Sequence, residues 1–147
     1  MPDPVEIADA LRGLQHRLRH RAHAETGDLG VTPAQARLLR VLGRCEAAPR
    51  MGELAQRLRV APRSVTDLVD PLEERGLLRR EQDPANRRVA LVRLTDEGRR
   101  VHAELHARAL ASAATAFEVL DEAERAQLLA LLRRVTTALD TAGDPAP

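Results

Sequence analysis

Apolar residues recur along the chain at spacings that predict amphipathic helices. A first group of four is separated by four, three and four positions, which aligns them on one face of a helix that ends near Gly27. Residues 51–58 and 62–76 each carry apolar residues at i, i+3, i+4 and i+7, the spacing of short helices with one buried face. The first group consists of Ile7, Leu11, Leu14 and Leu18.

Residues that begin and end helices support these assignments. Thr32 supplies an N-cap hydroxyl and Gln35 completes a capping box, so a helix is predicted from residue 33 onward. Pro62 suits the first position of the fourth helix, and Gly76 is suited to end it. Pro71 lies inside that helix, where a proline is expected to cost about 3 kcal/mol or to kink the helix.

After Gly76 the apolar period changes to that of β-strands. Residues 77–81 and 89–94 are predicted to form two short strands, with residues 82–88 as a loop that has a basic tip. Thr95 then N-caps a long helix, and residues 121–124 open a last helix. The last helix is unusually apolar for a surface helix because it carries Leu128, Leu129, Leu131, Leu132, Val135 and Leu139.

Composition favours one globular unit inside the cell. The chain has 147 residues, 44% of them hydrophobic and 31% charged, and no apolar run approaches the ~18 residues of a membrane span. The N-terminal segment lacks the positive region and long apolar stretch of a signal peptide. Cys45 is the only cysteine, so no disulfide can form within the chain. We therefore expect a cytoplasmic protein without a membrane contact.

The charge distribution favours contact with duplex DNA. All 23 basic residues are arginine; residues 50–100 hold 12 of them against 9 acidic residues, whereas residues 101–147 hold 4 against 7. A positive segment beside an acidic one fits local contact with a nucleic acid. Phe117 is the only aromatic residue, and modules for single-stranded DNA or RNA usually stack bases on several aromatic rings.

The order of the predicted elements indicates a winged helix-turn-helix, in which one helix enters a major groove and a hairpin reaches the adjacent minor groove. The buried face of the fourth helix leaves polar side chains exposed near its N-terminus, where they could contact bases or phosphates. Arginines near the hairpin tip suit a narrow minor groove. The candidate DNA contacts are Arg63, Ser64, Thr66 and Asp67 on the helix, and Arg79, Arg80, Asn86, Arg87 and Arg88 in the hairpin.

Residues 32–100 resemble the multiple antibiotic resistance regulator (MarR) family. The resemblance rests on Thr32-Pro33-Ala34-Gln35, Leu54-Ala55-Gln56-Arg57-Leu58, Leu68-Val69-Asp70, Leu72-Glu73-Glu74-Arg75-Gly76-Leu77, Asp83-Pro84-Ala85-Asn86-Arg87-Arg88 and Leu94-Thr95-Asp96-Glu97-Gly98.

The resemblance implies a mainly α fold with a small β-hairpin, organised as a single MarR-like domain over residues 1–147. Its DNA-binding lobe would span 32–98, with dimerisation helices at 1–27 and 99–142. It implies a homodimer that binds a pseudo-palindromic operator of double-stranded DNA, usually as a repressor released by a small anionic or phenolic effector. Arg88 then corresponds to the hairpin arginine that enters the minor groove.

Two positions depart from the family pattern. Aspartate is common where Asn86 stands, so the ion pair that steadies the tip arginine is expected to become a weaker neutral hydrogen bond. A basic residue is common where Asp67 stands, so the preferred DNA sequence is expected to be unusual. Asp67 could accept a hydrogen bond from a cytosine amine.

Other side chains suggest weaker alternatives. Histidines four apart can chelate a metal, but no HExxH motif or cysteine cluster accompanies them, so no metal or other cofactor is expected. Arg17 and His20 could attract an anionic effector. A nucleophile motif, a phosphate loop and a paired-carboxylate signature are absent from the sequence, which disfavours an enzyme. The alternative is a small-molecule or metal-binding sensor with weak or no DNA binding. The histidine pairs are His16 with His20 and His102 with His106.

Overall fold

The computed structural model describes residues 1, 3–24 and 27–142, and it confirms a mainly α fold with one antiparallel hairpin. The chain forms two units, residues 1–112 and 113–147. In order, the elements are α1 (Pro4–Ala24), the short 3-10 helix η1 (Gly27–Leu29), α2 (Pro33–Gly43), α3 (Met51–Leu58), α4 (Pro62–Glu74), β1 (Leu78–Asp83), β2 (Asn86–Leu94), α5 (Asp96–Ala116) and α6 (Glu122–Ala142).

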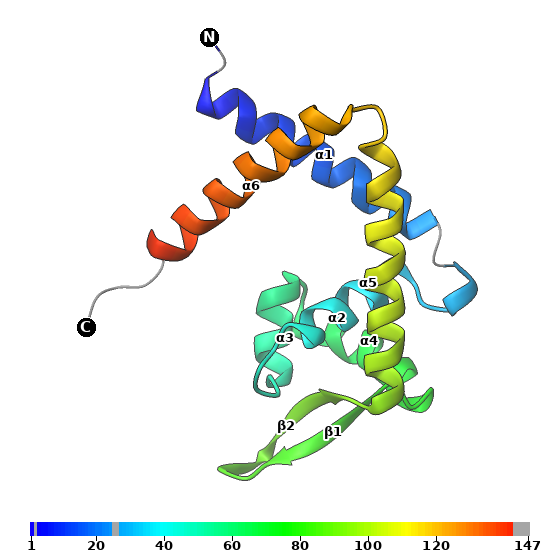
Figure 1. The fold of residues 1–147 in the computed structure, drawn as a ribbon. Helices are drawn as coiled ribbons and strands as arrows, with labels where there is room; N and C mark the ends of the chain where they lie inside the picture. Colours follow the sequence, from blue (N-terminus) through cyan, green and yellow to red (C-terminus); the bar gives the residue numbers. More distant parts are fainter. Residues whose placement is uncertain (2, 25–26, 143–147) are drawn as a thin grey trace. The chain divides into compact units, whose positions relative to one another are not determined.

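The core of the first unit lies among α2, α3, α4, the base of the hairpin and the start of α5 (Figure 1). Each of these elements contributes the apolar face that its sequence period predicts. Full burial of such a side chain stabilises the fold by about 1.5–3 kcal/mol. The largest fully buried side chains are Leu38, Leu39, Leu54, Leu58, Val65, Val69, Leu72, Leu78 and Val92.

Two predicted helix caps are confirmed in detail. The Thr32 hydroxyl accepts a hydrogen bond from the Gln35 amide at 3.2 Å, and the Gln35 side-chain oxygen accepts one from the Thr32 amide at 2.9 Å. Gly76 has φ +70°, and the Leu77 amide donates to the Leu72 carbonyl at 2.9 Å. This left-handed turn releases the chain directly from α4 into β1, which fixes where the hairpin begins.

Pro71 does not interrupt α4. The helix continues through the proline to Glu74, and the Arg75 amide donates to the Pro71 carbonyl at 3.2 Å. A proline removes one backbone donor, which here would have bonded to the carbonyl four residues earlier. Because Pro71 lies in the last turn, the helix keeps the hydrogen bonds of its first two turns.

The hairpin is longer than the sequence predicted. Residues 82–88 were expected to be a loop, but β1 extends to Asp83 and β2 begins at Asn86, so the turn contains two residues. Pairing is regular from Leu78 opposite Leu94 to Gln82 opposite Ala90, and a register shift then brings Asp83 opposite Asn86. The prediction failed because a run of polar residues has no apolar period that would indicate strands. In the structure, side chains of this run stabilise a tight turn by hydrogen bonds to the backbone.

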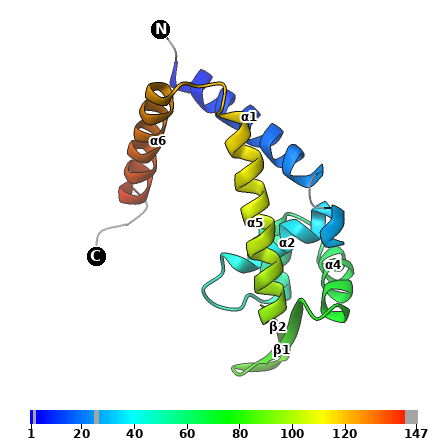
Figure 2. The ribbon, with the colours of Figure 1, turned by 45° about the vertical axis from the view of Figure 1, so that its right-hand side comes forward.

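The hairpin is held at its base by α5 and along β2 by the segment before α3. The Thr95 hydroxyl accepts from the Gly98 amide at 3.0 Å and donates to the Gly76 carbonyl at 2.5 Å, so the predicted N-cap also joins α5 to the end of α4. The Val92 amide donates to the Pro49 carbonyl at 2.9 Å. Figure 2 shows the hairpin extending away from α2 and α4 while α5 starts at its base.

Apolar side chains remain exposed on both terminal helices. On α1, Ile7 is 60% exposed. In the second unit, α6 begins with a capping box, in which the Asp121 and Glu124 carboxylates accept from each other's amides at 2.9 Å. On α6, Leu139 is 68% exposed. Within the described ranges, no helix has the length and apolar character needed to cross a membrane.

Candidate nucleic-acid interface

The exposed face of α4 carries the predicted polar residues. Val65 and Val69 are fully buried, whereas Arg63, Thr66 and Asp67 are exposed. Ser64, the remaining predicted contact on this helix, is half-buried. The N-terminal half of α4 therefore offers a cation, hydroxyl groups and a carboxylate, which are groups that can hydrogen-bond to base edges or phosphates.

The turn between α3 and α4 contains Arg59 in the left-handed conformation, with φ 54° and ψ 47°. Glycine usually occupies such a position because a Cβ there costs roughly 1–2 kcal/mol. The Val60 amide donates to the Ala55 carbonyl at 3.1 Å, which closes the turn around Arg59. An arginine thus stands between the two helices of the helix-turn-helix at a position where the backbone favours glycine.

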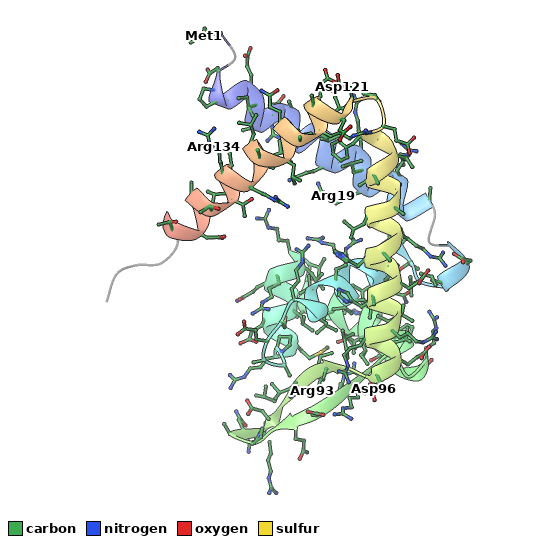
Figure 3. The ribbon with its side chains drawn as sticks, viewed as in Figure 1. Met1, Arg19, Arg93, Asp96, Asp121 and Arg134 are labelled. Atoms are coloured by element: carbon green, nitrogen blue, oxygen red, sulfur yellow. The ribbon has the colours of Figure 1, made fainter. Side chains whose placement is uncertain are left out.

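At the hairpin base, one glutamate joins two arginines. Arg79 and Arg93 are paired across the strands, and Glu81 lies 2.7 Å from Arg79 and 3.2 Å from Arg93. The hydrogen bond from Arg93 and the charges of both guanidinium groups lower the pKa of Glu81. Figure 3 labels Arg93 at this end of the hairpin, near Asp96 at the start of α5. The predicted contact Arg79 is therefore exposed but ion-paired.

Arg80 is turned toward α4. Its guanidinium forms ion pairs with Asp70 and Glu73, and its amide donates to the Glu73 carboxylate at 2.8 Å. These partners, led by Asp70, raise the pKa of Arg80. The structure thus places this predicted DNA contact within a protein ion-pair cluster, where it sets the position of β1 against α4.

Arg87 and Arg88 are exposed near the hairpin tip. In the part of the chain that the structure describes, neither guanidinium has a carboxylate within 4.0 Å. The Asn86 side-chain oxygen accepts a hydrogen bond at 3.1 Å from the backbone amide of Arg88, not from its guanidinium. The predicted hydrogen bond to the side chain of the tip arginine is therefore replaced by one to its backbone, which orders the backbone while the Arg88 side chain stays available to a ligand.

An ion pair that the sequence analysis missed anchors the tip. Asp83 is buried, and its carboxylate accepts from the Ala85 amide at 2.9 Å and from the Arg50 guanidinium at 2.8 Å. The Ala85 hydrogen bond is the largest cause that lowers the pKa of Asp83, followed by the bond from Arg50. No local pattern identifies this pair, because its members are separated by 33 residues.

A second polar region is lined by no residue of α4 or of the hairpin. An open hollow of about 820 Å³ is lined by residues of α1, α2 and α3 and by the residues that follow α2 and α3. The predicted effector residue His20 lines it, together with His16 and Arg19, whereas Arg17 is not among the lining residues. The structure thus gives one of the two predicted residues a place in a concave site.

The remaining candidate residues form simpler contacts. The Cys45 thiol donates to the Val41 carbonyl at 3.1 Å and accepts from Arg57 at 2.7 Å. The rings of His16 and His20 have centroids 6.4 Å apart. Over residues 1, 3–24 and 27–142, no three histidine, cysteine, aspartate or glutamate side chains gather closely enough to hold a metal ion.

Two short helices joined by a tight turn and followed by a hairpin define a winged helix-turn-helix protein. Residues 31–90 match the model of the MarR family. A curated relative, the HTH-type transcriptional repressor MdtR of Bacillus subtilis (strain 168), is 34% identical over 136 residues, covering 92% of this chain and 87% of its own. The chain belongs to the MarR family and is a DNA-binding transcriptional regulator of that family, not an enzyme.

Solved structures share the fold. The transcriptional regulator Tm0710 from Thermotoga maritima has a TM-score of 0.80 and 27% identity, with 95% of this chain and 98% of that chain covered. A point mutant of S. aureus MepR, bound to an oligodeoxyribonucleotide, has a TM-score of 0.66 and 22% identity, with 90% and 97% covered. The similarity to MepR concerns the fold alone.

Proposed function

We propose that this regulator is a cytoplasmic homodimer that represses transcription by binding a pseudo-palindromic operator in double-stranded DNA. The observation that carries the proposal is the presence, on one unit, of an exposed polar face on α4 and of unpaired arginines at the hairpin tip. A groove-binding helix and a minor-groove arginine form the two contacts of a winged helix-turn-helix.

In this proposal α4 lies in the major groove, where Arg63 contacts a guanine edge or a phosphate and Asp67 accepts from a cytosine amine. Arg88 enters the minor groove, with Arg87 beside the phosphates. Arg80 acts indirectly, because its ion pairs hold the hairpin against α4. A mutant of S. aureus MepR has the same fold and is bound to an oligodeoxyribonucleotide in its structure, which supports this mode of contact.

Dimerisation is proposed to bury the apolar faces of the terminal helices, residues 1–27 and 99–142. Single exposed leucines are ordinary on protein surfaces, but α6 presents a series of them on successive turns. Two copies related by a two-fold axis would present two recognition helices to half-sites about one helical turn apart. The exposed large apolar residues on these helices are Val5, Ile7, Leu11 and Leu14 on α1, Leu110 on α5, and Leu129, Leu131, Leu132, Val135 and Leu139 on α6.

Release by a small-molecule effector completes the proposal. An anion held beside the helix-turn-helix would lower DNA affinity if it bound the DNA-free conformation more tightly, because linkage between two sites is reciprocal. The hollow that His20 lines is the concave polar site in which such a ligand would bind. The rival function is a sensor on the same scaffold that binds the small molecule but has weak or no DNA binding.

A binding titration tests the DNA contact. Duplex DNA from beside the gene is titrated with the purified chain by fluorescence anisotropy at several salt concentrations. Replacing Arg88 by alanine should weaken binding and reduce the slope of log K against log salt by about 0.9 if one phosphate contact is lost. Arg12→Ala removes an exposed arginine of α1 and should leave the affinity and slope unchanged. Equal affinities of wild type and Arg88→Ala would remove Arg88 from the interface, and no operator binding by wild type would favour the sensor.

A further inference from the structure

Six arginines surround the hollow described above without a carboxylate among its lining residues. Three of them lie on α2 or just after it. Their spacing of i, i+3 and i+7 places them on one face of that helix. The others come from α1, from α3 and from the turn after α3. The six are Arg19, Arg37, Arg40, Arg44, Arg57 and Arg59.

Several arginines elsewhere in the fold are neutralised by a carboxylate. Arg50, Arg80 and Arg108 each have a carboxylate partner, as do arginines in the hairpin and on α5. Of the six around the hollow, none has an ion pair within the described ranges. The positive charge gathered around the hollow is therefore not neutralised by an ion pair among the described residues.

The positive charge is also costly to the protein. Arg40 is half-buried, and burial together with Arg44, Arg19 and Arg37 lowers the pKa of its guanidinium. Like charges on one helical face destabilise the helix. A bound anion would offset this repulsion, and one negative charge would offset only part of it.

We propose that the hollow binds a small molecule with two or more negative charges, of the phosphoanhydride or polycarboxylate class. Its lining favours this class over a flat phenolic ligand, because Pro33, Ala34 and Val41 are its only apolar residues and no phenylalanine, tyrosine or tryptophan lines it. Arginine binds such oxyanions by paired N–H donors. The regulatory role of this ligand rests on the effector release proposed above.

The hollow is separate from the proposed DNA contacts but adjoins the element that carries them. None of its lining residues belongs to α4 or to the hairpin. Arg57 lies on α3 and Arg59 in the turn before α4, so a ligand that draws these side chains inward would act directly on the helix-turn-helix. Figure 3 labels Arg19 on α1, which lines the hollow together with the arginines of α2.

The site is tested by isothermal titration calorimetry of the full chain without DNA, at fixed ionic strength of about 0.15 M. The probes are sodium tripolyphosphate, citrate and salicylate. Tripolyphosphate and citrate should bind once per chain and salicylate more weakly than either. The double variant Arg37→Gln/Arg44→Gln should weaken tripolyphosphate binding at least about tenfold, since two of the facing charges are removed.

The control variant Arg12→Gln/Arg21→Gln removes the same net charge from α1 outside the hollow. It should keep tripolyphosphate affinity within about threefold of wild type, because distant exposed charges are screened. No binding by wild type, tighter binding of salicylate, or an equal loss in both double variants would overturn the site. Circular dichroism verifies that each variant is folded before titration.

A second measurement separates this inference from the proposed function. Tripolyphosphate is added to the preformed complex with DNA, and Arg37→Gln/Arg44→Gln is titrated with DNA alone. Release from wild type but not from this variant supports the effector role. Calorimetric binding without release would keep the anion site and refute the effector mechanism. Loss of DNA affinity in the variant, without tripolyphosphate binding to wild type, would assign the arginines to the DNA backbone and overturn the inference.

Discussion

Gly98 in the first turn of α5 tests how the hairpin is joined to the helix. A Cβ built at this residue would lie 1.7 Å from the Leu77 carbonyl oxygen and 2.8 Å from its carbon. These are backbone atoms, so the clash cannot be relieved by rotating a side chain. The same carbonyl accepts the Thr95 amide at 3.1 Å, next to the N-cap of α5. Gly98→Ala must therefore displace the junction between the hairpin and α5.

The expected loss of stability follows from three effects. Overpacking costs about 1–3 kcal/mol and the strained Thr95–Leu77 hydrogen bond about 0.5–1.5 kcal/mol, while alanine returns up to about 1 kcal/mol through helix propensity. The net loss is about 2 kcal/mol, which corresponds to a decrease in Tm of roughly 4–8 °C for a chain of this length. Thermal unfolding followed by circular dichroism at one fixed protein concentration measures it.

Gly13→Ala is the matched control because no atom lies within 4 Å of the Cβ built at this position in α1. This substitution should leave Tm unchanged or raise it, since only the helix-propensity gain applies. A Gly98→Ala protein as stable as Gly13→Ala would refute the steric account. Operator affinity measured on the folded Gly98→Ala protein should also decrease, because the hairpin is displaced from α4.

Three further predictions concern the ion pairs and the proposed dimer. Glu73→Gln removes one of the ion pairs that hold β1 against α4, so it should weaken operator binding. The free energy of unfolding should fall by only about 1 kcal/mol, because this ion pair is partly exposed. Unchanged affinity would contradict this role. The lowered pKa of Asp83 means that its stabilising effect is present above the ordinary value of about 4 and is lost as pH falls through the lower folded value. In urea titrations the stability difference between wild type and Asp83→Asn should therefore shrink below about pH 4, and a constant difference would contradict the assignment. Leu132→Glu should give a monomer in analytical ultracentrifugation, whereas a stable dimer would exclude this face of α6 from the interface.

Local signals in the sequence were sufficient to predict the helices. The Thr32 capping box, the glycine stop at Gly76 and the Thr95 cap depend on residues within a few positions of each other, and each forms as predicted. The apolar period predicted which side of α4 is buried, and hence which of its polar residues are exposed. The outward face of α4 was therefore predictable from the sequence.

Contacts between distant residues were not predictable in the same way. The sequence shows Arg80 only as one of several cations in a basic hairpin. Its partners lie on the preceding helix, and whether Arg80 reaches them depends on the direction in which the hairpin leaves α4. No residue near Arg50 in the sequence indicates that it forms an ion pair, since its partner Asp83 is 33 residues away. The basic hollow combines three helices, so its charge emerges only once α1, α2 and α3 are packed.

The arginines of and around the hairpin divide by partner into two groups, and this division supports the DNA contact proposed above. Arg50 and Arg80 are paired with carboxylates, and they hold the two ends of the hairpin to α3 and α4. The tip arginines Arg87 and Arg88 lack such partners among the described residues, although Asn86 orders the backbone between them. Because the paired arginines fix the hairpin, less conformational entropy is lost when DNA binds, and the charges of the unpaired tip arginines stay available for the contact. Neutralising a paired arginine should therefore change the geometry of the interface, and neutralising a tip arginine should chiefly change its dependence on salt.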